Sequence, residues 1–310
     1  MAGRSDVVII GAGPAGLAAA IYTGRARLRT LVLEKGIPGG QILITDWIEN
    51  YPGFPGGIAP FDLMENFRKQ AVGFGAEIIM EEARGIGRDE ANPGGWIVRG
   101  AKGEYPARTV LLATGSEYRR LGLADEGRLV GRGVSYCATC DGAFFRERDI
   151  AVVGGGDTAL MEAVFLTKFA RKVYLIHRRD QLRGTKILQE RIFENPKIEV
   201  LWSSVVDSIK GRDNVEGVVL RGTKDGAKRD LAIEGLFISV GMDPISGFAK
   251  GLLELNEWGQ IVVDAQMAAS EPGIYAAGDV IAGTPRQVAT AVGTGVTAAI
   301  GINEFLSTYT

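Results

Sequence analysis

Residues 6–16 read Asp-Val-Val-Ile-Ile-Gly-Ala-Gly-Pro-Ala-Gly, and residues 149–159 read Asp-Ile-Ala-Val-Val-Gly-Gly-Gly-Asp-Thr-Ala. In each stretch, an apolar run typical of a buried parallel strand leads into a glycine-rich turn and then a helical segment. A second apolar run follows each of them, at residues 30–33 and 173–176. These two βαβ units, about 140 residues apart, predict an α/β fold with two doubly wound, Rossmann-like nucleotide-binding domains.

The second of these domains is predicted to be inserted into the first. Residues 113–116 close a strand before a polar, basic segment, and residues 238–244 mark a second crossing. We therefore assign residues 1–115 and 246–310 to a discontinuous first domain and residues 116–245 to the inserted one. Two short links of this kind form a natural hinge.

Composition narrows the function classes. The 310 residues are 46% hydrophobic and 23% charged, with a formal net charge of −2. This balance gives no electrostatic reason to expect a nucleic-acid or membrane partner. Glycines and Pro14 interrupt the apolar stretch 7–23, which argues against a signal peptide or membrane span, and the tail 288–306 is predicted to be a packed helix. With only two cysteines there is no disulfide framework, so a cytoplasmic location is expected.

The first glycine turn has the pattern of a dinucleotide site. Gly11, Gly13 and Gly16 would allow a tight turn, close approach of the backbone to a pyrophosphate and an open helix N-terminus. Glu34 ends the next apolar run, where an acid can bind ribose hydroxyls. This site therefore suits FAD or NAD.

The second turn differs at the position equivalent to Glu34. Glu34 follows Gly11 by 23 residues, and His177 follows Gly154 by the same 23. The acid is thus replaced by a basic segment, which comprises His177, Arg178 and Arg179, with Arg183 nearby. Arginines bind a ribose 2′-phosphate and a carboxylate would repel it, so the second site is predicted to bind NADPH rather than NADH.

Cys137-Ala-Thr-Cys140 lies just before the second turn and contains both cysteines of the chain. A structural zinc site ordinarily needs four ligands, and the chain has a single histidine, so no metal is expected. The spacing instead indicates dithiol–disulfide redox chemistry. A dithiol needs a two-electron mediator to accept hydride from a nicotinamide, which favours FAD at the first site. Asp141 is the candidate proton donor and acceptor, with a helix-capping role as the alternative.

The ordered motifs resemble the low-molecular-weight, bacterial-type thioredoxin reductases over nearly the whole chain. They include residues 11–16, 39–42, 49–53, 113–115, 137–141, 154–159, 177–183, 276–279 and 286–287. The resemblance implies that electrons pass from NADPH through FAD and the Cys137–Cys140 pair to the disulfide of thioredoxin. It places Cys140 next to the flavin and makes Cys137 the thiol that attacks the partner, and it implies a homodimer.

The resemblance also implies a set of cofactor ligands. Those for FAD are Gly11, Gly13, Gly16, Glu34, Gly40, Gln41, Asn50, Thr114, Gly115, Asp279, Arg286, Gln287 and Val288. Those for NADPH are Gly154, Gly156, Asp157, Thr158, Ala159, His177, Arg178, Arg179 and Arg183.

Two other functions stay open at this point. In one alternative, the acceptor is another thioredoxin-like or peroxidase-linked protein. In the other, the chain is a nucleotide-binding redox sensor without turnover. Phe144-Phe-Arg146 and Arg132 lie close in sequence to the cysteines. They would suit docking of an acidic protein partner, although phenylalanines are more often part of a core.

Overall fold

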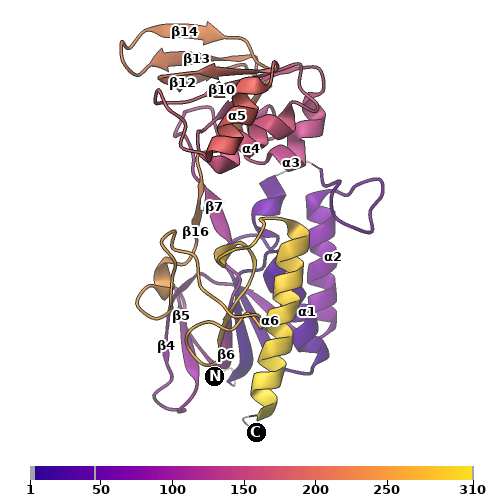
Figure 1. Cartoon of the computed structure of the whole chain (residues 1–310). Helices are drawn as coiled ribbons and strands as arrows, with labels where there is room; N and C mark the ends of the chain where they lie inside the picture. The colour runs from indigo at the N-terminus through magenta and orange to yellow at the C-terminus, as the bar shows by residue number, and fades with distance from the viewer. Residues whose placement is uncertain (1–3, 45–46, 309–310) are drawn as a thin grey trace. The chain divides into compact units, whose positions relative to one another are not determined.

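The computed structural model describes residues 4–44 and 47–308 and divides into two compact units (Figure 1). One unit comprises the described part of residues 1–43 together with Trp47–Glu117 and the chain from Asp243 onward. The other comprises Tyr118–Met242 with residue 44. The assignment of one cofactor to each domain stays a prediction.

The first unit is built on a sheet whose central strand is the apolar run of the first βαβ unit. This strand, β1, pairs in parallel with β2 on one side and β6 on the other, and β17 extends the parallel part beyond β6. An antiparallel meander, β4–β5–β6, was not predicted. The strands in spatial order are β3 (Glu77–Met80), β2 (Thr30–Glu34), β1 (Ser5–Ile10), β6 (Glu104–Leu112), β5 (Trp96–Gly100) and β4 (Ala83–Arg88), with β17 (Ile274–Ala276) beside β6.

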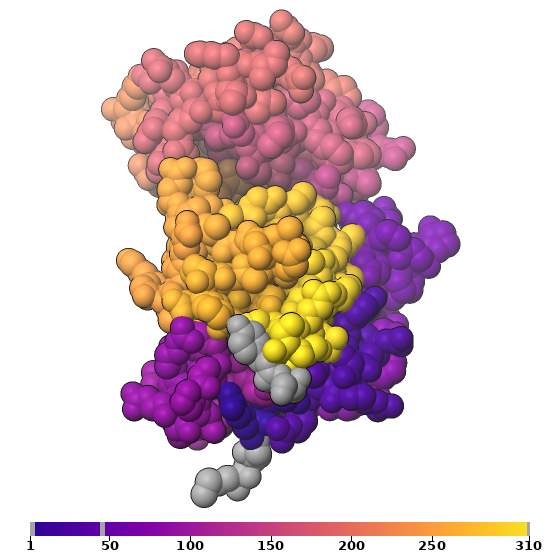
Figure 2. All heavy atoms as spheres, turned by 60° about the horizontal axis from the view of Figure 1, so that its bottom comes forward, coloured from indigo at the N-terminus to yellow at the C-terminus, as the bar shows by residue number. Residues whose placement is uncertain are grey.

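Three long helices accompany this sheet: α1 (Pro14–Arg25), α2 (Pro60–Gly73) and α6 (Val288–Thr308), with α1 packed against the other two. A Cβ atom on Gly295 of α6 would lie 2.2 Å from the carbonyl oxygen of Ala15, so the small residue permits the close crossing of α6 and α1. The predicted tail helix is confirmed as α6. Figure 2 shows α6 (yellow) at the surface beside the orange segment that follows residue 243. Within the described ranges, no helix is long and apolar enough to cross a membrane.

The second unit contains a fully parallel sheet built on the other βαβ unit. Its strands in spatial order are β11 (Ile198–Leu201), β10 (Lys172–Ile176), β9 (Asp149–Val153), β15 (Gly235–Ile238) and β8 (Val134–Ser135). Its helices are α3 (Ala138–Asp141), α4 (Asp157–Leu166) and α5 (Lys186–Glu194). An antiparallel sheet of β12 (Ser204–Lys210), β13 (Gly217–Gly222) and β14 (Lys228–Leu231) was not predicted.

The two predicted links are strands that pair with each other, β7 (Ser116–Tyr118) and β16 (Met242–Pro244). The remaining short helical turns are η1 (Gly40–Ile44), η2 (Gly142–Phe145), η3 (Gly247–Ala249) and η4 (Gly278–Val280). With a parallel βαβ sheet in each unit, the predicted α/β class with two doubly wound units is confirmed.

Candidate active site

The first glycine turn has no room for a side chain at Gly11 or Gly16. A Cβ atom on Gly16 would lie 1.9 Å from the carbonyl oxygen of Gly11, and one on Gly11 would lie 2.4 Å from that of Ala113. Gly11 also has a φ of +105°, a conformation that favours glycine. Gly13 is the N-cap of α1. The turn therefore brings the backbone to a helix start with no side chains from Gly11 or Gly16 in the way, as close approach of a pyrophosphate requires.

Glu34 is held at this turn by the backbone. Its Oε2 accepts a hydrogen bond from the N–H of Ala12 at 2.7 Å, and its Oε1 accepts one from the N–H of Gly36 at 2.9 Å. The carboxylate is thereby fixed at the carboxyl end of β2, where an acid can bind the ribose hydroxyls of a nucleotide.

Several other predicted flavin residues are held in place by hydrogen bonds within the first unit. The Asn50 side-chain amide donates to Oε1 of Gln287 at 3.1 Å, and that of Gln41 donates to the carbonyl oxygen of Ser116 at 3.0 Å. The Thr114 hydroxyl donates to the carbonyl oxygen of Ile245 at 2.7 Å. Of the others, Gly40 and Gly115 have positive φ, Val288 begins α6, and Asp279 lies in η4.

Asp279 is largely buried, and burial raises its pKa to about 6 in spite of the opposing charge of Arg286. The unfolded carboxyl has a pKa of about 3.9, so the folded state favours the protonated form. The stabilisation from this protonation is fully present below about pH 4 and is lost as the pH rises through about 6.

We therefore expect Asp279→Asn to stabilise the flavin-free protein at pH 8, by about 1–2 kcal/mol after discounting for partial exposure. Urea unfolding at pH 8 and pH 4 measures the effect, and the difference from the unmodified chain should vanish at pH 4. An equal difference at both pH values would contradict the prediction.

The second glycine turn leads into α4, and like the first turn it lacks room for a side chain at its first glycine. A Cβ atom on Gly154 would lie 2.4 Å from the Ala159 side chain, whereas one on Gly156 would meet nothing within 4 Å. Asp157 is the first residue of α4, and its Oδ1 accepts a hydrogen bond from the N–H of Thr185 at 2.6 Å. The turn thus presents an open helix start next to the predicted phosphate-binding segment.

His177 is buried beside this turn. Its Nδ1 lies 2.7 Å from the carbonyl oxygen of Gly154, and its Nε2 lies 2.9 Å from that of Gln181. Both ring nitrogens therefore contact the protein backbone, so the ring ties the turn to the loop after β10. This geometry favours a positioning role for His177, and its direct contact with NADPH stays a prediction. The side chains of Arg178, Arg179 and Arg183 are exposed.

The central glycine of this turn makes room for that ring. A Cβ atom on Gly155 would lie 2.2 Å from the imidazole, so Gly155→Ala must displace it. Overpacking of this kind costs about 1–3 kcal/mol, and we expect the KM for NADPH to rise about tenfold. Flavin content should not change. Steady-state kinetics with Gly73→Ala as the control tests this, because a Cβ atom on Gly73 meets nothing within 4 Å. An unchanged KM would contradict the prediction.

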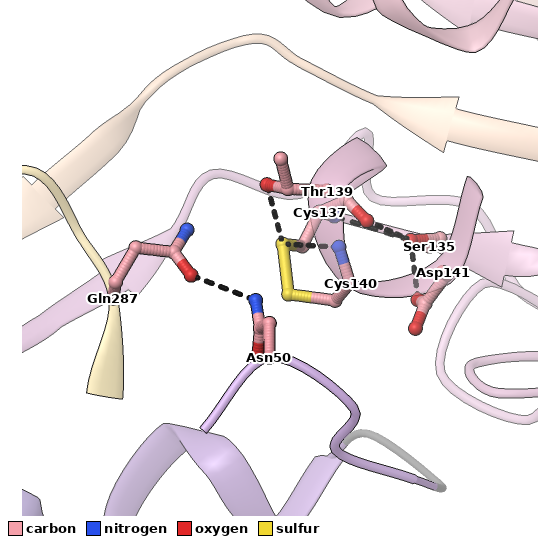
Figure 3. The surroundings of a disulfide bond; sticks show 7 residues. All are labelled: Asn50, Ser135, Cys137, Thr139, Cys140, Asp141 and Gln287. Carbon is pink, nitrogen blue, oxygen red and sulfur yellow. Dashed lines mark hydrogen bonds between the residues drawn. A yellow bond between two sulfur atoms is a disulfide. The ribbon is translucent and has the colours of Figure 1, made fainter. Parts of the chain in front are cut away.

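The two cysteines form a disulfide at the start of α3 (Figure 3). Cys137 is the N-cap, and its Sγ accepts a hydrogen bond from the N–H of Cys140 at 3.2 Å. The Ser135 hydroxyl accepts from the N–H of Cys137 at 3.1 Å and donates to Oδ2 of Asp141 at 2.6 Å. The hydroxyl therefore connects Asp141, the predicted proton carrier, to the backbone at the start of α3, the helix called the redox helix below.

The disulfide and the second glycine turn lie at the same edge of one sheet. Strands β8, β15 and β9 are parallel neighbours, so their carboxyl ends share that edge. Cys137 follows β8, and Gly154 follows β9. Two strand spacings of about 4.8 Å each separate these strands. Such an edge is where ligands bind in doubly wound folds.

The sequence reasoning missed one acid near the disulfide, Glu162 on α4. Its carboxyl group accepts hydrogen bonds from the N–H of Ala138 and from the Ser239 hydroxyl, and burial raises its pKa. The only sequence signal is a lone acid within the apolar stretch 159–166. Within the part of the chain that the structure describes, no group of three or more His, Cys, Asp or Glu residues is placed to hold a metal.

The second unit has a disulfide and a glycine turn on one sheet edge, and the first unit has a glycine turn with a ribose-type acid, Glu34. These features define a pyridine nucleotide-dependent disulfide oxidoreductase. The family model for pyridine nucleotide-disulphide oxidoreductases matches residues 5–295. The thioredoxin reductase of Streptomyces coelicolor is 46% identical over 304 residues, covering 97% of this chain and 94% of that protein. That of Treponema pallidum is 45% identical over 303 residues, covering 98% and 97%.

The structure is also similar to the crystal structure of thioredoxin reductase from Streptococcus pyogenes. The TM-score is 0.93 with 44% sequence identity, covering 98% of this chain and 99% of that one. The chain belongs to the low-molecular-weight, bacterial-type thioredoxin reductase family, as its motifs predicted. It is an enzyme of this class, whose cofactors are FAD and NADPH. The residues fit both groups, because each glycine turn leaves a helix start open and only the first carries a ribose-type acid.

Proposed function

We propose that this chain reduces the disulfide of thioredoxin with electrons from NADPH, passed through FAD to the Cys137–Cys140 pair. The observation that carries the proposal is the disulfide at the start of α3, on the same sheet edge as the second glycine turn. When bound, FAD supplies two-electron transfer between the nicotinamide and this disulfide.

Cys137 has the surroundings of an attacking thiol. The N–H of Cys140 donates to its Sγ, and the Thr139 hydroxyl lies 3.6 Å from the same sulfur. Both groups favour negative charge on Cys137 once the disulfide opens, and the thiolate is the nucleophile in disulfide exchange. We therefore assign the attack on thioredoxin to Cys137 and the position nearest the flavin to Cys140.

Asp141 is proposed to hold or release the proton of this exchange. Its carboxylate accepts from the Ser135 hydroxyl, which in turn accepts from the N–H of Cys137. This arrangement keeps the carboxyl group at the redox helix in a fixed orientation. A pH profile of thioredoxin reduction by Asp141→Asn tests the role, and a profile identical to that of the unmodified chain would exclude it.

The test of the whole relay is anaerobic titration with NADPH and then with thioredoxin. We expect NADPH to reduce the flavin, and added thioredoxin to reoxidise it through repeated turnovers. Flavin reduction without repeated turnovers would favour a redox sensor. Turnover with another thioredoxin-like or peroxidase-linked protein alone would identify a different acceptor.

Phe144 is the best candidate for an anchor on the partner protein. Its side chain is 46% exposed. The neighbouring Phe145 is buried, and its ring centroid lies 5.1 Å from that of Phe237. Arg146 and Arg132 are exposed and basic, as steering of an acidic partner requires.

We expect Phe144→Ala to raise the KM for thioredoxin about tenfold, because an exposed aromatic anchor contributes about 1–2 kcal/mol. Reduction of the flavin by NADPH should be unaffected. The matched control is Trp258→Ala, which removes an exposed aromatic side chain of the other unit. Equal KM values for Phe144→Ala and the unmodified chain would rule out this anchor.

We also propose that the enzyme acts in the cytoplasm as a homodimer. The family resemblance supports the dimer, and a chain with only two cysteines, both in the redox motif, suits a reducing compartment. Sedimentation of the holoenzyme tests the dimer, and a monomer at assay concentration would contradict it. Fractionation of cells tests the location, and recovery of the enzyme outside the cytoplasmic fraction would contradict it.

A further inference from the structure

Glu162 contacts the segments that follow two strands, β8 and β15, at the edge that carries the disulfide. Its carboxyl group is largely buried and accepts hydrogen bonds from the N–H of Ala138 and the hydroxyl of Ser239. Ala138 directly follows Cys137 after β8. Ser239 follows β15, and its N–H donates to the carbonyl oxygen of Val153 at the end of β9 at 2.9 Å. The helix α4, which carries Glu162, opens from the second glycine turn.

The carboxyl group lacks a compensating cation. The elements packed most extensively against α4 are α3, α5, β9 and β10. Their charged or titratable residues are Cys137, Cys140 and Asp141 at α3, Lys186, Glu190, Arg191 and Glu194 on α5, Asp149 on β9, and Lys172 and Tyr174 on β10. In the described ranges, none of these shifts the pKa of Glu162, which burial raises and the hydrogen bonds from Ser239 and Ala138 lower. Its ionised form is therefore costly.

Opening of the disulfide adds a second negative charge close to this carboxyl group. The N–H of Cys140 donates a hydrogen bond to the Cys137 sulfur and stabilises a negative charge on it. The N–H of Ala138, the residue after Cys137, donates to the Glu162 carboxyl group instead. Two neighbouring like charges oppose each other, so the thiolate favours the neutral form of the largely buried carboxyl group. The two groups then titrate as a pair.

We propose that Glu162 is a positioning residue that takes up one proton when the Cys137–Cys140 disulfide is reduced. The proposal rests on the relay described above. NADPH supplies an electron pair and one proton, the S–S bond breaks, and the products are one thiol and one thiolate. The Glu162 carboxylate takes the second proton from solvent. When the partner disulfide is reduced, it receives both electrons and, in total, both protons.

The test is the thiol–disulfide equilibrium of the holoenzyme in dithiothreitol redox buffers between pH 6 and pH 9, followed by alkylation and mass measurement of Cys137 and Cys140. Glu162→Gln keeps the hydrogen-bonding shape but removes the charge. At pH 9 we expect it to shift the equilibrium about tenfold toward the dithiol, a change of about one pKa unit. Because burial raises the pKa of Glu162, the variant and the unmodified chain should converge as the pH falls and the carboxyl group takes up its proton.

Ser239→Ala provides an independent variant with a different signature. Loss of its hydroxyl removes a hydrogen bond that lowers the pKa of Glu162. The pKa of Glu162 should therefore be higher in this variant. Its thiol–disulfide equilibrium should equal that of Glu162→Gln at low pH and depart from it at a higher pH than the equilibrium of the unmodified chain does. The matched control is Glu190→Gln, which neutralises an exposed acid on α5 and should match the unmodified chain at every pH.

The proposal is overturned if Glu162→Gln follows the unmodified chain at every pH, or if Glu190→Gln shifts equally. If Glu162→Gln does not fold, an unchanged pH dependence in Ser239→Ala overturns it. Flavin reduction by NADPH serves as the check of folding. Failure of the unmodified chain to reduce thioredoxin, with the pH-dependent shift intact, would remove the proposed function but not the role of Glu162.

Discussion

Replacement of Cys140 by serine is expected to stop thioredoxin reduction, with turnover lowered on the order of 10³-fold or more. A serine hydroxyl cannot form the disulfide that connects the flavin to the partner protein. NADPH should still reduce the flavin, because its predicted site is the glycine turn after β9 and not the cysteine pair. Stopped-flow absorbance of the flavin and steady-state consumption of NADPH with thioredoxin measure the two steps separately.

Cys137→Ser should have the same effect on turnover. The chain contains no third cysteine that could replace either thiol. Thr139→Ala is the matched control, because it removes a hydroxyl 3.6 Å from the Cys137 sulfur but keeps both thiols. It should retain turnover within about tenfold, since a weak hydrogen bond contributes about 1 kcal/mol. Full turnover in either serine variant would disprove the relay.

The parts of the fold that follow from local sequence were predictable. A buried apolar strand followed by a glycine turn is specified within about a dozen residues, because only glycine tolerates the close backbone contacts of the turn. Gly16 and Gly154 illustrate this, since a Cβ atom on either would overlap neighbouring atoms. The equivalence of Glu34 and His177 also followed from counting along the two repeats, and both side chains contact their glycine turns.

The parts that depend on tertiary packing were not predictable. The meander β4–β5–β6 and the sheet β12–β14 consist of short strands whose pairing depends on long-range partners. Glu162 reaches the redox helix only because α4 packs against α3, and no pattern in its own segment indicates that contact. For His177, the sequence indicated the correct neighbourhood but not that both ring nitrogens contact backbone carbonyl groups.

The exposed residues Arg178 and Arg179 are expected to determine the preference for NADPH over NADH. Arg178 and Arg179 follow His177, whose ring fixes the start of this segment against the glycine turn. A charged hydrogen bond contributes about 1.5–3 kcal/mol. The double variant Arg178→Ala/Arg179→Ala should therefore lower kcat/KM for NADPH by about 10²–10³-fold. Its kcat/KM for NADH should change little, because NADH lacks the 2′-phosphate.

The ratio of the two kcat/KM values separates recognition of the phosphate from general damage to the site. Loss of folding or a displaced glycine turn would lower activity with both coenzymes, whereas loss of the arginines lowers only that with NADPH. Arg191→Ala removes an exposed arginine on α5 and should leave the ratio unchanged. Raised salt should weaken NADPH binding in the unmodified chain more than in the double variant, because exposed charges are screened. An unchanged NADPH/NADH ratio in the double variant would show that other groups recognise the phosphate.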